Sequence, residues 1–163
     1  MPFTPFHLGP GVFFKGLGGT RISFMVFGGA QVLMDIEPLV RILQRDEILH
    51  GITHTVPGAL VIGLVAGAAG KPISEAILKW FGILRVPITW AVSFSTALIG
   101  TMSHILLDGV MHRDMTPFWP FVDGNPLLGL LDVGLLHVVC AICAVIGGIA
   151  VAVRWSMRND QDR

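Results

Sequence analysis

Two long stretches of this 163-residue chain contain almost no charged side chains. Residues 86–111 include no Lys, Arg or Glu and only Asp108, near their end, and residues 133–153 include no charged residue at all. In lipid, backbone polar groups must be hydrogen-bonded within the segment itself, and about 20 apolar helical residues cross a bilayer core of roughly 30 Å. Both stretches therefore predict transmembrane helices.

Two further segments are weaker candidates for spans. Residues 22–43 are interrupted by Asp35 and Glu37, and residues 55–70 reach spanning length only when residues 50–54 form their first turn. The chain is 53% hydrophobic and 13% charged, which is too apolar for a soluble domain of this size. We predict an all-α, polytopic membrane helix bundle with about four transmembrane helices, forming a single domain over residues 1–163.

Shorter elements are expected around these spans. Thr4 followed by Pro5 resembles an N-cap with proline at the first helical position, which predicts a short N-terminal helix and turn within residues 1–21. Residues 71–85 combine an apolar face with charged positions and predict an amphipathic helix at the membrane interface. Residues 113–126 predict an ordered loop, and residues 154–163 a polar tail.

Glycines recur inside the predicted spans. Helix interfaces in lipid favour small side chains, because these let two backbones approach closely. The glycines expected at such interfaces are Gly63, Gly67, Gly70, Gly147 and Gly148.

Basic residues are divided unequally between the two ends of a four-span bundle. The end expected to hold both termini and the 71–85 segment has Lys15, Arg21, Lys71, Lys79, Arg85, Arg154, Arg158 and Arg163. The opposite end has Arg41, Arg45 and Arg113. By the positive-inside rule, both termini should be cytoplasmic.

Charge and cysteine content narrow the classes of partner. The formal net charge is zero and basic residues never form a run, so the chain lacks the electrostatic footprint of a nucleic-acid-binding protein. Cys140 and Cys143 lie in an apolar stretch without a second pair, and we interpret them as small buried side chains. The expected partners are membrane lipids and, in a homo-oligomer or a larger membrane complex, other protein chains.

Histidines and acidic residues recur at helical spacing. His104, Asp108 and His112 follow one another every four residues, which places them on one face of the third predicted span. His50 and His54 show the same spacing at the start of the second span. Pairs at i and i+4 let two side chains of one helix bind one cation.

The depth of these residues predicts that they meet. Asp35 lies about 18 Å along the first span from Ser23, and His104 lies roughly 27 Å from Val86, so both fall in the non-cytoplasmic half. His7 reaches the same end if residues 5–16 run antiparallel to the first span. The predicted ligands are His7, Asp35, His50, His54, His104, Asp108 and His112.

Mixed histidine and carboxylate ligands favour a divalent metal, zinc above manganese or iron, and the size of the set favours two ions. Glu37 is on a different helical face from Asp35 and is either a general base or a group that supports a ligand. Thr53, Thr55 and Ser103 are candidates to orient ligands or to cap helices. His137 has no partner at i+4 and is expected to be a packing residue, and Asp123 and Asp132 are expected to cap or order the loop before the fourth span.

The ordered motifs resemble a known family. They are Met1-Pro2-Phe3-Thr4-Pro5-Phe6-His7, Asp35-Ile36-Glu37, His50-Gly51-Ile52-Thr53-His54-Thr55 and Ser103-His104-Ile105-Leu106-Leu107-Asp108. Over residues 1–126 this order is similar to that of the YdjM-like, LexA-binding inner membrane-associated hydrolases and their relatives. The resemblance implies a bacterial inner (cytoplasmic) membrane, multi-pass topology, and metal ligation by Asp35, His50, His54, His104 and Asp108. The chain has Asp35-Ile36-Glu37 where the commoner family form is Asp-x-Asp after a proline.

The leading functional expectation is a metal-dependent membrane hydrolase that acts on a phosphoester or lipid-derived substrate, with Glu37 in a catalytic role. The alternative from another class is a non-catalytic integral membrane subunit whose His and Asp cluster is a structural metal site or polar packing. A bis-histidine haem protein and a metal-ion transporter are further alternatives, which a Soret band or metal uptake into vesicles would reveal.

Overall fold

The computed structural model describes residues 5–84 and 86–161, and every regular element in these ranges is helical. This confirms the predicted all-α class. The expected N-cap Thr4 and the basic residues Arg85 and Arg163 lie outside the described residues, as does the side chain of Arg158.

Three of the described helices are long and apolar enough to cross a membrane. They are α4 (Val56–Trp80), α5 (Trp90–Met111) and the part Val133–Met157 of α6 (Val133–Gln161). At 1.5 Å per residue these segments of 22 to 25 residues extend about 33–38 Å, which exceeds a hydrocarbon core of about 30 Å. Ser and Thr residues cap the helices as their sequence positions suggest: Thr55 accepts from the N–H of Gly58, and Thr89 from that of Val92.

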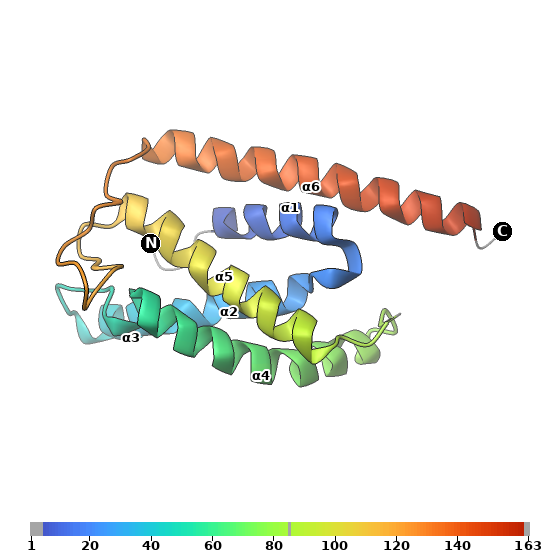
Figure 1. The fold of residues 1–163 in the computed structure, drawn as a ribbon, viewed down its shortest axis with the longest axis horizontal. Helices are drawn as coiled ribbons and strands as arrows, with labels where there is room; N and C mark the ends of the chain where they lie inside the picture. The colour runs from blue at the N-terminus through green and yellow to red at the C-terminus, as the bar shows by residue number, and fades with distance from the viewer. Residues whose placement is uncertain (1–4, 85, 162–163) are drawn as a thin grey trace.

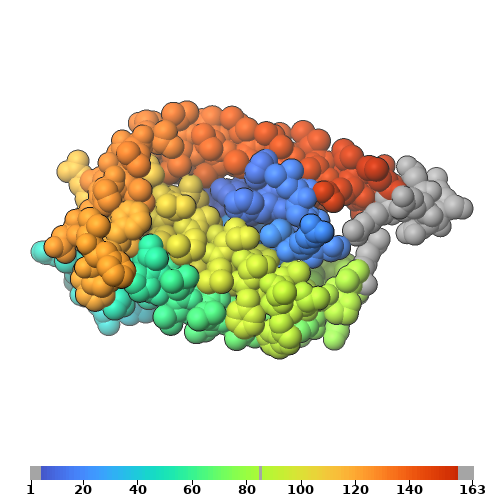
Figure 2. All heavy atoms as spheres, in the orientation of Figure 1, coloured from blue at the N-terminus to red at the C-terminus, as the bar shows by residue number. Residues whose placement is uncertain are grey.

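The N-terminal part forms a hairpin of two short helices. A 3-10 turn, η1 (Pro5–His7), leads into α1 (Leu8–Gly18), and a second turn, η2 (Gly19–Arg21), leads into α2 (Phe24–Met34). Each helix has 11 residues, about 16 Å, or roughly half of the hydrocarbon thickness. In Figures 1 and 2, α1 lies between α6 and the layer formed by α4 and α5.

The segment 22–43, expected as the first span, is two helices. α2 ends at Met34, and α3 (Ile36–Gln44) starts after Asp35. Pro38 explains the break, because it has no N–H for the carbonyl of Met34 four residues earlier and its ring crowds that carbonyl. The interruption puts the Asp35 carboxylate at a helix junction inside the bundle.

The prediction of a separate interfacial helix over residues 71–85 is wrong. α4 continues through Pro72 to Trp80, so Lys71 belongs to the same helix as Val56. Neighbouring groups hold this part of the helix together: the ammonium of Lys71 lies 2.6 Å from the carboxylate of Glu75, which also accepts from the N–H of Ile88 at 2.7 Å. A proline removes one backbone hydrogen bond, and membrane helices tolerate this where surrounding groups compensate.

Glycines permit two close helix contacts. A Cβ on Gly67 would lie 2.4 Å from Cδ1 of Phe94 on α5, and one on Gly147 would lie 2.4 Å from the backbone of Val12 and Phe13 on α1. Gly148 differs from expectation, because a Cβ there would meet no heavy atom within 4 Å. Gly148 therefore faces away from the described helices.

Two buried apolar clusters stabilise the bundle of α2, α4 and α5. One consists of Val26, Ala30, Ala66, Ile88 and Ala97. The other consists of Met34, Ala59, Ile105 and Met115, and it includes a residue of the long loop between α5 and α6. This loop is also attached by polar contacts, since the Asn125 amide donates to the carbonyls of Gly109 and His112 at the end of α5.

Candidate metal centre

The predicted ligands meet at one end of the bundle. This is the end where α2 and α5 end and α4 begins (Figure 1). We call this the histidine end. α5 contributes His104 and Asp108 from its last two turns and His112 from its C-cap. The other ligands come from η1, from the junction of α2 and α3, and from the turn before α4: His7, Asp35, His50 and His54.

A first group consists of Asp35, His54, His104 and Asp108, all buried. One potential ligand atom from each residue lies within 4.8 Å of those of the others. Nε2 of His104 is 3.1 Å from Oδ2 of Asp108 and 3.5 Å from Oδ1 of Asp35, and Nε2 of His54 is 3.8 Å from Oδ2 of Asp108. Ligand atoms around one tetrahedral zinc ion are about 3.3 Å apart, so this group has the spacing of a metal site.

A second group consists of His50, Asp108 and His112. Nε2 of His50 lies 3.9 Å from Oδ2 of Asp108, and Nε2 of His112 lies 4.0 Å from Oδ1 of the same carboxylate. The rings of His50 and His112 are 4.2 Å apart between their centroids. Asp108 belongs to both groups, which is the arrangement of a carboxylate that can bridge two cations.

His7 lies beside these groups. Its Nε2 is 3.2 Å from Oδ1 of Asp108, and its ring contacts the ring of His104 at a centroid distance of 5.0 Å. The N-terminal hairpin therefore brings its first histidine to the same carboxylate that the two groups share.

The buried histidine nitrogens test whether these residues fit a metal. Nε2 of His7, His54 and His104 is buried and has no hydrogen-bond partner, although each faces Asp108. An unpaired buried polar nitrogen costs free energy, and buried polar groups in proteins are nearly always hydrogen-bonded. A cation between these nitrogens and the carboxylates would satisfy them, so the residues fit a metal.

In three of the histidines, Nδ1 donates a hydrogen bond to a neighbouring residue on the side away from Asp108. For His104 the acceptor is Oε1 of Gln31 at 2.7 Å, and for His50 it is the Asp114 carboxylate at 3.0 Å. For His54 it is Oγ1 of Thr53 at 3.0 Å. Because each Nδ1 donates its hydrogen outward, each Nε2 keeps its lone pair for the interior, which is the tautomer that a metal ligand needs.

Gln31 and Asp114 were not among the expected site residues. Each had a sequence signal: Gln31 is polar within an apolar segment and lies four residues before Asp35, and Asp114 lies two residues after His112. These positions alone do not predict the contacts, because Gln31 meets His104 only through the packing of α2 on α5.

Glu37 lies behind His54, on the side opposite Asp108. One carboxylate oxygen of Glu37 accepts from the hydroxyl and, at 3.1 Å, from the N–H of Thr53, while the other accepts from Arg41 at 2.9 Å. Burial raises the pKa of Glu37, but the hydrogen bonds from Thr53 and Arg41 outweigh it and hold the pKa below its usual value. Glu37 therefore remains a carboxylate that supports the Thr53–His54 contact.

Asp114 ties the long loop to His50. Its carboxylate accepts from the N–H of Leu49 at 2.8 Å and of His50 at 3.1 Å in addition to the His50 ring. Burial raises the pKa of Asp114, but these hydrogen bonds outweigh it and lower the pKa to about 2. The group is therefore ionised over the physiological range.

The remaining candidates lie outside the two groups. His137 packs against the Phe6 ring at a centroid distance of 4.5 Å, as expected of a packing residue, and its buried Nε2 has no hydrogen-bond partner. Thr55 and Asp132 cap helices, and the hydroxyl of Ser103 accepts from the Gln31 amide at 3.3 Å. Cys140 is buried and Cys143 is partly buried, and both are free thiols.

Comparisons with known proteins agree with the resemblance seen in the sequence motifs. The model of the family described as YdjM inner membrane protein matches residues 17–159. Curated proteins and solved structures gave no match to the chain. The family match covers most of the chain, including every residue of the two groups, and three helices are suited to a membrane. The chain therefore belongs to the YdjM inner membrane protein family.

Proposed function

We propose that this protein is a membrane-embedded, metal-dependent hydrolase that holds two divalent ions, zinc by preference, and acts on a phosphoester of a lipid-derived substrate. The observation that carries the proposal is the set of inward-facing Nε2 atoms of His7, His54 and His104, which are buried without hydrogen bonds around the carboxylate of Asp108. Divalent ions bound there would supply Lewis acidity, which lowers the pKa of water and withdraws electron density from phosphoryl oxygens.

The residues have separate roles in this proposal. Asp35, His54 and His104 would hold one ion and His50 and His112 the other, and Asp108, which belongs to both groups, would serve both ions. His7 contacts Asp108 from the side of α1 and closes the centre toward the N-terminal hairpin.

Three polar residues position the histidine ligands. Gln31, Thr53 and Asp114 fix the rings through Nδ1, and such contacts orient ligands and raise their basicity. We assign Glu37 a positioning role through Thr53 in place of the general-base role expected from the sequence, because its oxygens are engaged with Thr53 and Arg41.

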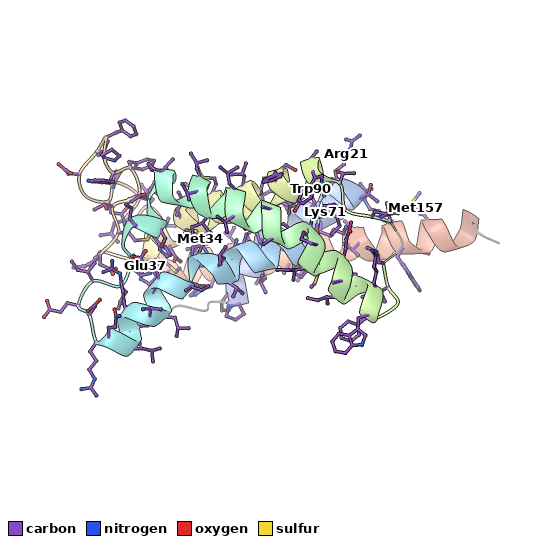
Figure 3. The ribbon with its side chains drawn as sticks, turned by 90° about the horizontal axis from the view of Figure 1, so that it is seen from below. Arg21, Met34, Glu37, Lys71, Trp90 and Met157 are labelled. Atoms are coloured by element: carbon purple, nitrogen blue, oxygen red, sulfur yellow. The ribbon has the colours of Figure 1, made fainter. Side chains whose placement is uncertain are left out.

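We also propose that the histidine end faces the non-cytoplasmic side of an inner membrane. The opposite end, which we call the basic end, has Lys15, Arg21, Lys71, Lys79 and Arg154, and Figure 3 shows Arg21 and Lys71 far from Glu37 and Met34. The positive-inside rule places the basic end, and with it the end of α6, in the cytoplasm. Since Pro5–His7 lies at the histidine end, this arrangement favours opposite sides for the two ends of the described chain, in contrast to the sequence expectation.

Elemental analysis of detergent-purified protein tests the metal centre. Wild type should contain two equivalents of zinc, manganese or iron, and the double variant His54→Ala, His104→Ala should contain almost none. His137→Ala is the matched control, because Nε2 of His137 is also buried and without a hydrogen-bond partner but the residue lies outside both groups. No metal in wild type, after purification without chelators and with metal added back, would overturn the proposal.

A phosphoesterase and lipid-phosphatase screen tests the reaction. Activity should require metal, be lost on chelation and return on adding the metal back. Full activity in a metal-free preparation would rule out the proposed chemistry. Bound metal without hydrolysis, together with a stable stoichiometric partner in native purification, would instead favour the alternative of a structural metal site in a membrane subunit.

A further inference from the structure

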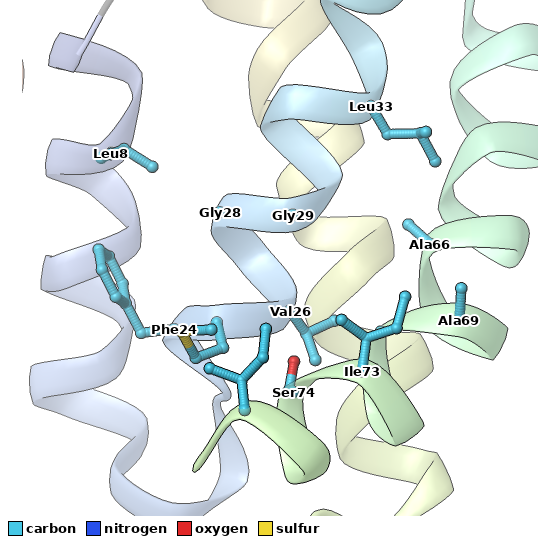
Figure 4. A pocket seen from close by; sticks show the side chains of 13 residues that line it. Leu8, Phe24, Val26, Gly28, Gly29, Leu33, Ala66, Ala69, Ile73 and Ser74 are labelled. Carbon is cyan, nitrogen blue, oxygen red and sulfur yellow. The ribbon is translucent and has the colours of Figure 1, made fainter. Parts of the chain in front are cut away.

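A half-open apolar trough runs along α2. Its volume is about 410 Å³, and its walls come from α1 and α4. The lining includes Leu8, Gly28, Gly29, Leu33, Ala66 and Ile73, and among the described lining residues only Ser74 has a polar side chain. Figure 4 shows Gly28 and Gly29 at its centre, between Leu8 on one side and Ala66 on the other.

One end of the trough is lined by residues that neighbour two site residues in the sequence. Leu8 directly follows His7, and Leu33 lies two residues before Asp35. The other end is formed near Phe24 and Ile77, toward the basic end. Because α2 rises 1.5 Å per residue, the distance from Phe24 to Leu33 along the helix is about 14 Å.

The dimensions of the trough favour a hydrocarbon chain over a helix as its occupant. A volume of 410 Å³ over about 14 Å gives a mean cross-section of about 30 Å². A helix with its side chains is 10–12 Å wide and needs about 80 Å² or more, so a helix of a second copy would not fit inside the trough. A single extended acyl chain fits a narrow groove with an almost wholly apolar lining.

We propose that the trough holds an acyl chain of the substrate, so that the substrate of the metal centre is a membrane lipid whose phosphoester lies at the histidine end. This rests on the proposed function. Gly28 and Gly29 are the specificity-determining residues, because the absence of side chains there leaves the floor of the trough open. A Cβ on Gly29 would meet no heavy atom within 4 Å, so the space above it is free for a ligand.

The test uses the full-length protein in phosphatidylcholine nanodiscs that contain a phosphatidic acid with a diazirine in the middle of one acyl chain. After photolysis, mass spectrometry should locate the label mainly on trough-lining residues of α2 and α4. Gly29→Leu should reduce this labelling at least fivefold, because the leucine side chain starts from a Cβ that meets no heavy atom within 4 Å and extends into the trough. Gly148→Leu is the matched control: a Cβ there also meets no heavy atom within 4 Å, but it lies on α6.

Metal content and hydrolysis separate this proposal from the proposed function. Both variants should keep the wild-type metal content. Gly29→Leu should lower turnover of the long-chain lipid at least fivefold, whereas Gly148→Leu should leave turnover of both this lipid and p-nitrophenyl phosphate at the wild-type level. Trough labelling without hydrolysis of either compound would contradict the proposed function while supporting the lipid site.

Three results would overturn the trough proposal. One is equal labelling of α6 and the trough, which would mean that the label reports only bulk lipid. Another is trough labelling that Gly29→Leu does not change. The third is a disulfide between copies of Gly29→Cys in the Cys140→Ala, Cys143→Ala background, which would identify the trough as a contact between copies.

Discussion

Nδ1 of His104 donates a 2.7 Å hydrogen bond to Oε1 of Gln31, and the Gln31 amide donates to the carbonyl of Gly100 at 3.0 Å. The second bond fixes which end of the amide faces His104. Because Oε1 of Gln31 can only accept, Nδ1 of His104 must carry the hydrogen. The Nε2 lone pair of His104 therefore faces Asp35 and Asp108. Thr53 and Asp114 have the same effect on His54 and His50.

Gln31→Leu should weaken metal binding at the first group by about 10–100-fold, the range seen when an outer hydrogen-bond partner of a metal ligand is lost. The affinity can be measured by competition with a chelator. Ser103→Ala is the control, because it removes the contacts of the hydroxyl with Gln31 and with the Gly100 carbonyl but leaves the His104 bond in place. Equal affinities for Gln31→Leu and wild type would show that the amide does not orient His104.

Asp114→Asn should weaken metal binding by the second group and leave metal binding by the first group unchanged. The amide cannot accept all of the hydrogen bonds that the carboxylate takes from the His50 ring and from the N–H groups of Leu49 and His50. We expect the loss of one metal equivalent at limiting metal, with an affinity about 10–100-fold lower for that ion only. Loss of both ions to the same extent would argue against two separately supported positions.

Asp108→Asn should remove both ions, because its carboxylate is shared by the two groups. The asparagine side chain is nearly the same size but neutral, so packing changes little while the bridging charge is lost. Metal content measured by elemental analysis should fall further than in Asp114→Asn. A variant that kept one full equivalent would mean that Asp108 serves a single ion.

Gly147→Leu should lower the stability of the bundle by about 1–3 kcal/mol, the usual cost of overpacking a close contact. A Cβ at this position would lie 2.4 Å from the backbone of Val12 and Phe13, so α1 and α6 would have to separate. Thermal unfolding in detergent measures the change. Gly148→Leu should unfold at the wild-type temperature, since its side chain meets no other helix.

Cysteine labelling tests the proposed orientation. In the Cys140→Ala, Cys143→Ala background, Asp123→Cys at the histidine end should react with a membrane-impermeant maleimide added to intact spheroplasts. Lys79→Cys, at the basic end, should react only after the membrane is permeabilised. Both side chains are exposed, so the reverse pattern would place the metal centre on the cytoplasmic side.

The sequence alone determined the helical class and which histidines and acidic residues gather at one end of the bundle. Long apolar stretches can satisfy their backbone polar groups in lipid only as helices, and the i, i+4 spacing of His104, Asp108 and His112 requires them to share a face. Depth along the predicted spans also placed Asp35, His50 and His54 at the same end, because each follows from counting residues at a fixed rise.

Only the tertiary structure decided where the helices break and which neighbours hold the ligands. The two prolines show why. Pro38 ends α2 at Met34, whereas α4 continues through Pro72, and the difference lies in the surrounding contacts, such as the Glu75 carboxylate that joins Lys71 and Ile88. The bonds from Gln31 to His104 and from Asp114 to His50 join residues 73 and 64 positions apart, so no local pattern could reveal them. Helical periodicity is a local property that a sequence shows directly, whereas these contacts arise only when α2, α5 and the loop after α5 pack together.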